Sequence, residues 1–178
     1  MVEEAKLVPT ETGLVPEGAG WFVVNAREAR WSESEVFDRY CTFQGDVAFP
    51  EVGFNISVLQ PGRPACMYHR EENQEGFLVV SGECLLLVEG EERRLGPWDF
   101  FHCPPWTEHV LVGVGPGVCV VIGVGARTPG SGVVYPRSEV AERHGASVVE
   151  TTESPADAYA HAPDPRERPY AEGDLPDW

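Results

Sequence analysis

Four side chains that can bind a metal ion lie in two short segments of the chain: His69, Glu71, Glu75 and His109. His69 and Glu71 are two residues apart in a stretch that has the pattern of a strand, so alternation points both side chains to one face. Glu75 follows a predicted turn and leads into an apolar run, and His109 begins another apolar run after a proline-containing turn. Two imidazoles and two carboxylates converging on one point suit a divalent transition metal better than a purely hard cation.

Each of these residues also has a purely structural explanation. A single histidine on a strand is more often hydrogen-bonded than metal-bound. Glu71 could turn outward and pair with Arg70 or Arg93 instead of binding a cation. Glu75 is harder to explain in this way, because a carboxylate that points into a barrel is costly without a counter-charge or a cation.

The first segment resembles the first motif of the cupin family, which runs Gly, His-x-His, three or four residues, Glu, six residues, Gly. His69 falls at the position of the first histidine, and Glu75 and Gly82 match the Glu-x6-Gly spacing. Glu71 stands in place of the second histidine, and the leading glycine, Gly62, is one residue further away than in the motif.

The second segment resembles the second cupin motif, which runs Gly, five residues, Pro-x-Gly, two residues, His. Pro104 and His109 match the proline and the histidine, whereas Trp98 and Trp106 stand in place of the two glycines. The resemblance covers roughly residues 53–125.

This resemblance implies an all-β chain with a cupin-type double-stranded β-helix, that is, a jelly-roll barrel. It also implies one divalent transition metal (zinc, iron, manganese, nickel or copper), with His69, Glu71, Glu75 and His109 as candidate ligands. The expected function is binding of a small molecule in the barrel, with metal-dependent dioxygenase or isomerase activity. Two alternatives stay open: a non-enzymatic barrel that binds or senses a small ligand, and a metal-free structural cupin.

Residues close in sequence to the candidate ligands could contact the substrate. We expect Phe101, Cys103 and Trp106 at the substrate surface, and Cys66 is a further candidate for the pocket lining. Alternation places Phe101 and Cys103 on one face of their strand and His102 on the other. The remaining aromatic residues of this region, among them those at positions 98 and 100, are expected in the core.

We expect the chain to divide into three parts: residues 1–50 as an N-terminal extension, 51–127 as the barrel and 128–178 as a C-terminal extension. Short apolar runs and many glycines and prolines favour strands joined by turns. Barrel strands are predicted in the stretches 54–60, 84–95 (a hairpin that turns at 89–91), 98–104, 109–115 and 118–126.

Both extensions carry weaker signals. In the N-terminal one we expect a strand over 21–24 and then a short helix begun near Ser32 or Ser34. In the C-terminal one, Ser138 could cap a short helix. After Glu150 the composition turns to proline, alanine and acidic residues, which predicts partial disorder or a segment lying on a partner surface.

Composition excludes several classes of partner. A formal net charge of -16 argues against nucleic acid and anionic membranes. No stretch approaches the ~20 apolar residues of a membrane span, and the N-terminal sequence lacks the features of a signal peptide. Five cysteines without a Cys-x-x-Cys pair are typical of a reduced, cytoplasmic protein. We expect a homodimer, formed by adding strands at a sheet edge around residues 21–24 or 133–135.

Overall fold

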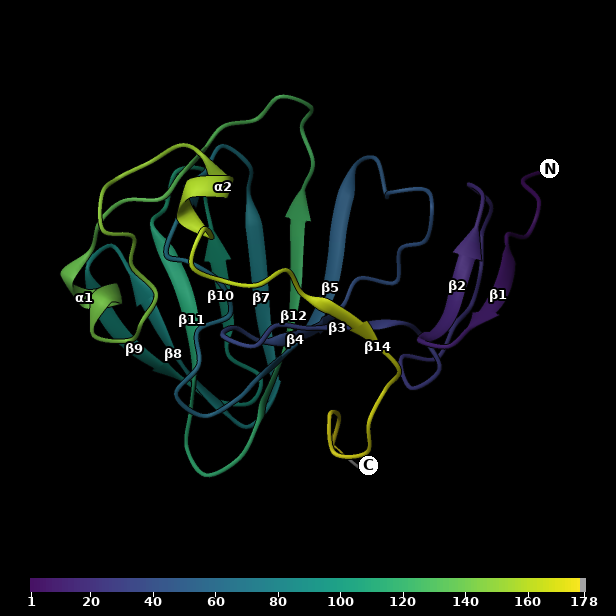
Figure 1. The fold of residues 1–178 in the computed structure, drawn as a ribbon, viewed down its shortest axis with the longest axis horizontal. Helices are drawn as coiled ribbons and strands as arrows, with labels where there is room; N and C mark the ends of the chain where they lie inside the picture. Colours follow the sequence, from purple (N-terminus) through teal and green to yellow (C-terminus); the bar gives the residue numbers. More distant parts are fainter. Residues whose placement is uncertain (177–178) are drawn as a thin grey trace.

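The computed structural model describes residues 1–176, which form antiparallel sheets and two single-turn helices (Figure 1). The strands are β1 (Lys6–Thr10), β2 (Gly13–Glu17), β3 (Trp31–Glu33), β4 (Arg39–Cys41), β5 (Val52–Leu59), β6 (Arg70–Glu71), β7 (Glu75–Ser81), β8 (Glu83–Val88), β9 (Glu91–Leu95), β10 (Phe100–Cys103), β11 (His109–Val114), β12 (Cys119–Ala126), β13 (Val133–Val134) and β14 (Arg166–Arg168). The helices are α1 (Glu139–Glu142) and α2 (Pro155–Ala158). The expected all-β class is confirmed, and neither helix of residues 1–176 has the length of a membrane span.

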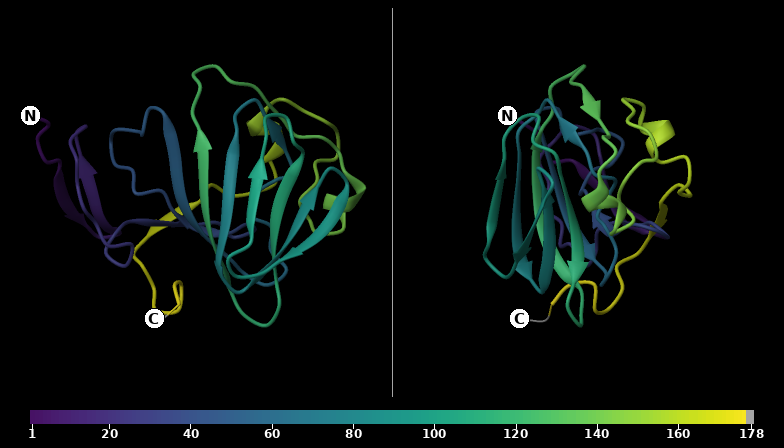
Figure 2. Two further views of the ribbon diagram at one scale, coloured as in Figure 1. Left: turned by 180° about the vertical axis from the view of Figure 1, so that it is seen from behind. Right: turned by 90° about the vertical axis from the view of Figure 1, so that its left-hand side faces the viewer.

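Two sheets pack face to face and enclose the core. The larger has the strand order β10-β7-β12-β5-β4-β3-β14, and the smaller has the order β11-β8-β9 (Figure 2). Apolar side chains from both sheets meet between them: Leu59, Val79, Cys84, Leu86, Leu111, Cys119 and Val121. Burial of this shared apolar layer is the main force that holds the sheets together. The arrangement is the jelly roll that the sequence predicted.

The barrel strands lie close to where the alternation patterns place them. The hairpin predicted over 84–95 is formed by β8 and β9, which pair in register from Cys84 with Leu95 to Val88 with Glu91. Its turn residues Glu89 and Gly90 both have positive φ, at 48° and 78°. Two positive-φ residues match the right-handed twist of the flanking strands, so a two-residue turn closes this hairpin.

The N-terminal predictions are wrong in two places. Residues 21–24 form no strand, and Trp21 makes only an isolated bridge with Glu4. The helix expected from Ser32 or Ser34 is instead the β3-turn-β4 hairpin. The Ser34 hydroxyl accepts hydrogen bonds from the backbone N–H groups of Val36 and Phe37, at 3.3 and 3.1 Å. Serine makes such bonds at turns as well as at helix N-caps, so the signal was real but ambiguous.

The C-terminal extension lies on its own barrel. The helix capped by Ser138 is confirmed as α1. Partial disorder after Glu150 is wrong for the described residues, because α2 follows and β14 pairs with β3 (Figure 1). The segment is held by Asp174, which is 1% exposed and bonds Arg39 and Arg168 at 2.8 and 2.5 Å. An acidic composition predicted disorder, but this carboxylate has arginine partners on β4 and β14.

Two tryptophans adopt backbone conformations that normally favour glycine. Trp98 and Trp106, which replace the glycines of the second motif, have φ of 73° and 66°. This left-handed region costs a non-glycine residue roughly 1–2 kcal/mol. Trp98 is also 69% exposed and Phe100 is 64% exposed, so the expectation that both belong to the core is wrong. Phe101 and Cys103 take the inner face of β10, and alternation leaves Phe100 outside.

Candidate metal centre

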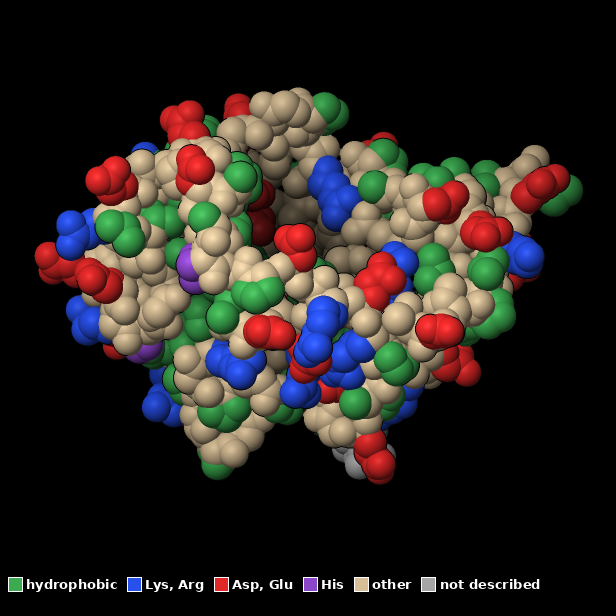
Figure 3. All heavy atoms as spheres, viewed as in Figure 1, with side chains coloured by type: hydrophobic (Ala, Val, Ile, Leu, Met, Phe, Trp, Pro, Cys, Tyr) green, Lys and Arg blue, Asp and Glu red, His purple; other side chains and the backbone are tan. Residues whose placement is uncertain are grey.

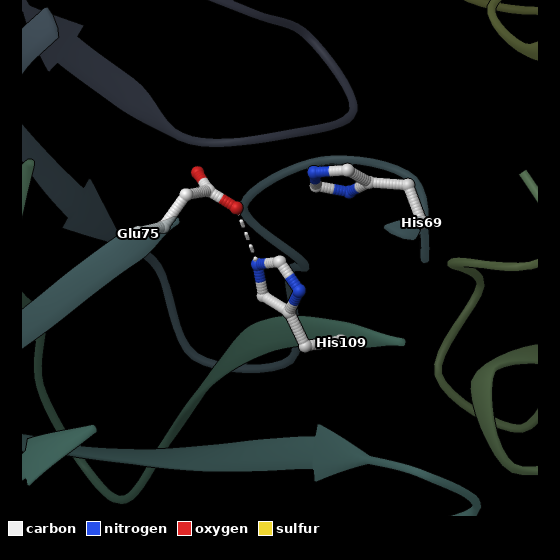
Figure 4. A group of neighbouring side chains, drawn as sticks. All are labelled: His69, Glu75 and His109. Atoms are coloured by element: carbon white, nitrogen blue, oxygen red, sulfur yellow. Dashed lines mark ion pairs between the residues drawn. The ribbon is translucent and has the colours of Figure 1, made fainter. Parts of the chain in front are cut away.

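Three of the four predicted ligands converge in the barrel: His69, Glu75 and His109. Their ligand atoms all lie within 4.8 Å of one another (Figure 4). The Nε2 atom of His109 is 3.2 Å from Oε2 of Glu75, and the two imidazole centroids are 4.8 Å apart. We call these residues the ligand triad. They line an interior cavity of about 260 Å³.

Backbone pairing brings the two histidines together although they are far apart in sequence. The amide of His69 donates to the carbonyl of His109 at 3.1 Å, and the amide of His109 donates back at 2.8 Å. Glu75 is the first residue of β7, where it is paired with Cys103 of β10 and Gly125 of β12. A Cβ on Gly125 would lie 3.5 Å from Cγ of Glu75, so the Glu75 side chain packs beside this glycine.

The two imidazoles are oriented by the same local device. Nδ1 of His69 lies 2.9 Å from the carbonyl of Met67, and Nδ1 of His109 lies 3.0 Å from the carbonyl of Thr107. A carbonyl can only accept, so each Nδ1 carries the hydrogen. In a neutral imidazole the other nitrogen, Nε2, then has a free lone pair. Both lone pairs are available to a metal ion, and the carbonyls act as the outer partners that fix ligand orientation.

The electrostatics of the triad allow two states. Burial opposes a charged His109, but its contacts with Cys103 and Glu75 outweigh this and raise the pKa of His109 to about 10. Burial, together with the charge on His109, lowers the pKa of His69. Without a cation, His109 is therefore an imidazolium paired with the Glu75 carboxylate. With a cation, His109 would have to release its proton and bind through Nε2.

Glu75 supplies a direct sign that a cation fits here. Its Oε2 is buried and accepts no hydrogen bond from any group of residues 1–176. When Nδ1 of His109 carries the only ring hydrogen, the 3.2 Å contact with Nε2 joins two acceptors. Such a pair is unfavourable unless a proton or a metal ion lies between the two atoms. Two imidazole nitrogens and one carboxylate oxygen form a ligand set found in non-haem iron sites, and they also suit zinc, manganese, nickel and copper.

Glu71 lies beside the triad but outside it. It lines an outer pocket of about 520 Å³ together with Glu75. Burial, and then the charge on Glu75, raise the pKa of Glu71 to about 7. Arg70, one of its expected alternative partners, pairs with Glu108 at 3.2 Å. Ligation by Glu71 stays a prediction.

The outer pocket is the mouth of the interior cavity. Figure 3 shows a hollow on this face, with acidic side chains inside it and a basic side chain at its rim. The outer pocket has this composition, since Glu71 and Glu75 line it together with Arg127. Tyr40 and Asn55 line both the outer pocket and the interior cavity, so the two spaces are adjacent.

The three residues expected at the substrate surface lie around His109 and do not line either pocket of the described chain. The ring centroid of Phe101 is 5.8 Å from that of His109, and Sγ of Cys103 is 3.4 Å from Nδ1 of His109. Trp106 is 46% exposed. Their contact with substrate stays a prediction. Cys66 does line the interior cavity, where burial raises the pKa of its thiol.

Sequence reasoning missed a polar part of the cavity lining. Asp38, Tyr40, Asn55 and Ser57 line it, and all four come from β4, β5 or the turn before β4. We call them the polar wall. The signal was present in residues 54–58, where polar Asn55 and Ser57 alternate with apolar side chains.

Comparisons with known proteins agree with this geometry. Residues 55–125 match the family model described as "Cupin domain". A search of curated proteins found no match. A protein assigned as a sugar phosphate isomerase from Acidithiobacillus ferrooxidans superposes with a TM-score of 0.54 and 23% identity, over 59% of this chain and 73% of that one. The polyketide cyclase RemF from Streptomyces resistomycificus superposes with a TM-score of 0.53 and 15% identity, over 62% and 83%.

At these identities the two solved structures establish the fold and nothing finer. The fold, the matched segment and the spacing of the two motifs point to the same conclusion. Over residues 55–125 the chain is similar to the cupin family, and its fold is the cupin fold.

Proposed function

We propose that this cupin binds one divalent transition metal at the ligand triad and acts on a small molecule in the cavity, as an enzyme of dioxygenase or isomerase type. The observation that carries the proposal is the orientation of the triad. Both Nδ1 atoms are engaged by carbonyls, and the buried Oε2 of Glu75 lies 3.2 Å from Nε2 of His109, which donates no hydrogen bond to it when His109 is neutral. His69, Glu75 and His109 would hold the ion, with Glu71 as a candidate fourth ligand.

The chemistry depends on open positions around the ion. Three protein ligands leave coordination sites for water or substrate, and a bound metal polarises a carbonyl, lowers the pKa of bound water or activates dioxygen. The chain's own residues orient the ligands and shape the cavity. Phe77, Val110 and Leu111 give the cavity apolar sections that exclude water, and the polar wall offers hydrogen-bonding groups in the space that the triad also lines.

One observation favours the metal-free alternative. The ion pair between His109 and Glu75, at 3.2 Å, would satisfy both residues without a cation. A barrel of that kind would bind a ligand or serve a structural role and would have no metal-dependent activity.

Elemental analysis of the purified, untagged protein distinguishes these functions. We expect close to one equivalent of iron, manganese, nickel, copper or zinc per chain, and its loss in Glu75→Gln and His109→Ala. Two matched controls, Glu72→Gln and His102→Ala, change exposed residues of the same types and should retain the metal. A wild-type protein that takes up no metal even on reconstitution would overturn the proposal.

We further propose that the chain forms a homodimer, although not through residues 133–134. Residues 133–134 pair within their own chain as β13 against β6. The outer face of the large sheet is a better candidate, because Trp98, Phe100, Val52 and Val124 are 69, 64, 46 and 38% exposed. Exposed apolar patches commonly mark protein interfaces. Light scattering should give a dimer for the wild type and a monomer for Phe100→Asp, and a monomeric wild type would contradict this.

A further inference from the structure

The polar wall lines the same cavity as the ligand triad, and β12 alone separates its strand β5 from β7, which carries Glu75. Tyr40 of β4 is paired with Ser57 of β5, and Asn55 lies two residues from Ser57 on the same face of that strand. The opposite face of β5 is apolar, with Ile56 and Val58 packed in a second core cluster. The strand therefore turns its polar side toward the interior, which is the reverse of an ordinary barrel strand.

A directional chain of hydrogen bonds organises this wall. The amide nitrogen of Asn55 donates to the Ser57 hydroxyl at 2.9 Å. Ser57 has one hydrogen, and it is directed to the carboxylate of Asp38. Gly123 allows Asn55 its position, because a Cβ there would lie 2.6 Å from the side-chain oxygen of Asn55. The wall is thus held in one arrangement before any ligand arrives.

Asp38 is a buried carboxylate whose hydrogen-bonding capacity is only partly used. It is only 5% exposed, and within residues 1–176 no ion pair includes it. A carboxylate can accept about four hydrogen bonds. Ser57 and the residue's own amide account for two of them. A buried carboxylate without a cation is costly, so a purely structural role would favour asparagine at this position. Its remaining acceptor capacity faces the cavity.

The charged residues that line the cavity limit the charge that a ligand there can carry. No lysine or arginine of the described chain lines the interior cavity, whereas Asp38 and Glu75 both do. Within this cavity an anionic group would be repelled by these carboxylates except at the metal ion. A hydroxyl group, which donates to a carboxylate and accepts from an amide, matches the wall.

We propose that the polar wall binds the hydroxyl groups of a neutral, polyhydroxylated small molecule that lies between it and the triad. Asp38 accepts hydrogen bonds from the ligand, Ser57 and Asn55 hold Asp38 in place, and Phe77 contacts the ligand's apolar surface. This inference rests on the proposed function, since the metal ion would bind the other end of the ligand. Pockets of about 520 and 690 Å³ adjoin the cavity and share Tyr40 with it, so there is room for a ligand larger than 260 Å³.

The test uses xylose and myo-inositol as probes, with cyclohexanol as a probe of similar size with a single hydroxyl group. Binding to the full-length, Zn²⁺-loaded protein is measured by saturation-transfer NMR. We expect both polyols to bind more tightly than cyclohexanol. Asp38→Ala and Asp38→Asn should weaken polyol binding by about tenfold or more, because a hydrogen bond to a charged group is lost. Ser57→Ala should weaken it less, and Asp157→Asn, which changes an exposed aspartate, should leave it unchanged.

Zinc content is measured on every sample, so that the two proposals can fail separately. Full zinc content with no polyol binding, or with equal binding by the wild type and Asp38→Ala, overturns this inference and leaves the metal site intact. A wild type that takes up none of zinc, iron, manganese, nickel and copper overturns both. Asp38→Asn is nearly isosteric with the native residue, so a folding defect in Asp38→Ala would not remove the test.

Discussion

Binding of one divalent metal ion at pH 8 should release about one proton from the protein. In the absence of a cation the pKa of His109 is raised to about 10, because its contacts with Cys103 and Glu75 outweigh the opposing effect of burial. Nearly every molecule therefore carries a proton on Nε2 of His109 at pH 8, and that proton must leave before Nε2 can bind. The pKa of His69 is lowered, so that imidazole is already neutral and contributes no second proton.

The same argument fixes the pH dependence of affinity. Below the pKa of His109, each unit of pH changes the protonated-to-neutral ratio about tenfold, which equals about 1.4 kcal/mol of binding free energy. Metal affinity should therefore rise about tenfold per unit between pH 7.5 and 9, and it should flatten near pH 10. Isothermal titration calorimetry with Zn²⁺, in buffers of different ionisation enthalpy, measures both the affinity and the number of protons released.

Glu71→Gln is the control for proton counting. The pKa of Glu71 is raised to about 7, so at pH 8 this carboxyl is largely ionised with or without metal. The variant should still release about one proton. Bound metal with no proton released at pH 8, and an affinity that is flat from pH 7 to 9, would refute the reasoning: His109 would then be neutral beside Glu75. Two protons released would mean that His69 is also charged.

Three further predictions concern stability, measured by urea unfolding. Burial raises the pKa of Asp38 to about 7, so the folded state holds this proton more tightly than the unfolded state and wild-type stability falls as pH rises from about 4 to about 7. Between pH 4.5 and pH 8, the stability of Asp38→Asn relative to the wild type should therefore increase by up to ~4 kcal/mol. An equal difference at both pH values would contradict this. Trp98→Gly should be more stable than Trp98→Ala by about 1 kcal/mol, because φ is 73° there; equal stabilities would show that the backbone is not strained. Asp174→Ala should lose about 3 kcal/mol and expose residues 166–176 to proteolysis, because two arginines lose a buried partner; unchanged cleavage would argue against this carboxylate as the anchor.

The ligand positions could be predicted from sequence because they are local. His69, Glu75 and His109 stand at spacings that a strand and a turn determine, and each histidine is oriented by a carbonyl only two residues before it. The barrel strands were predictable for the same reason, since alternation reflects which side of a strand is buried. The sequence prediction was wrong where the same local hydrogen bonds occur in two structures, as at Ser34, whose hydroxyl could cap a helix or close a turn.

The polar wall could not be predicted, because its meaning depends on distant parts of the chain. Residues 54–58 alternate apolar and polar side chains, but alternation alone does not say which face points inward. That choice was made by Trp31 and Cys41, which cover the apolar face of β5, and by Gly123, which leaves space for Asn55. Asp38 follows a turn for which the sequence predicted a helix.

The sequence by itself determined the fold class, the strands of the barrel and three side chains able to bind a metal ion. The tertiary structure decided that those ligands line the same cavity as a buried carboxylate that has no ion pair within residues 1–176. The physical reason is that burial and electrostatics belong to a position in space: Asp38 and His109 are 71 residues apart in the chain (109 minus 38), yet they line the same cavity.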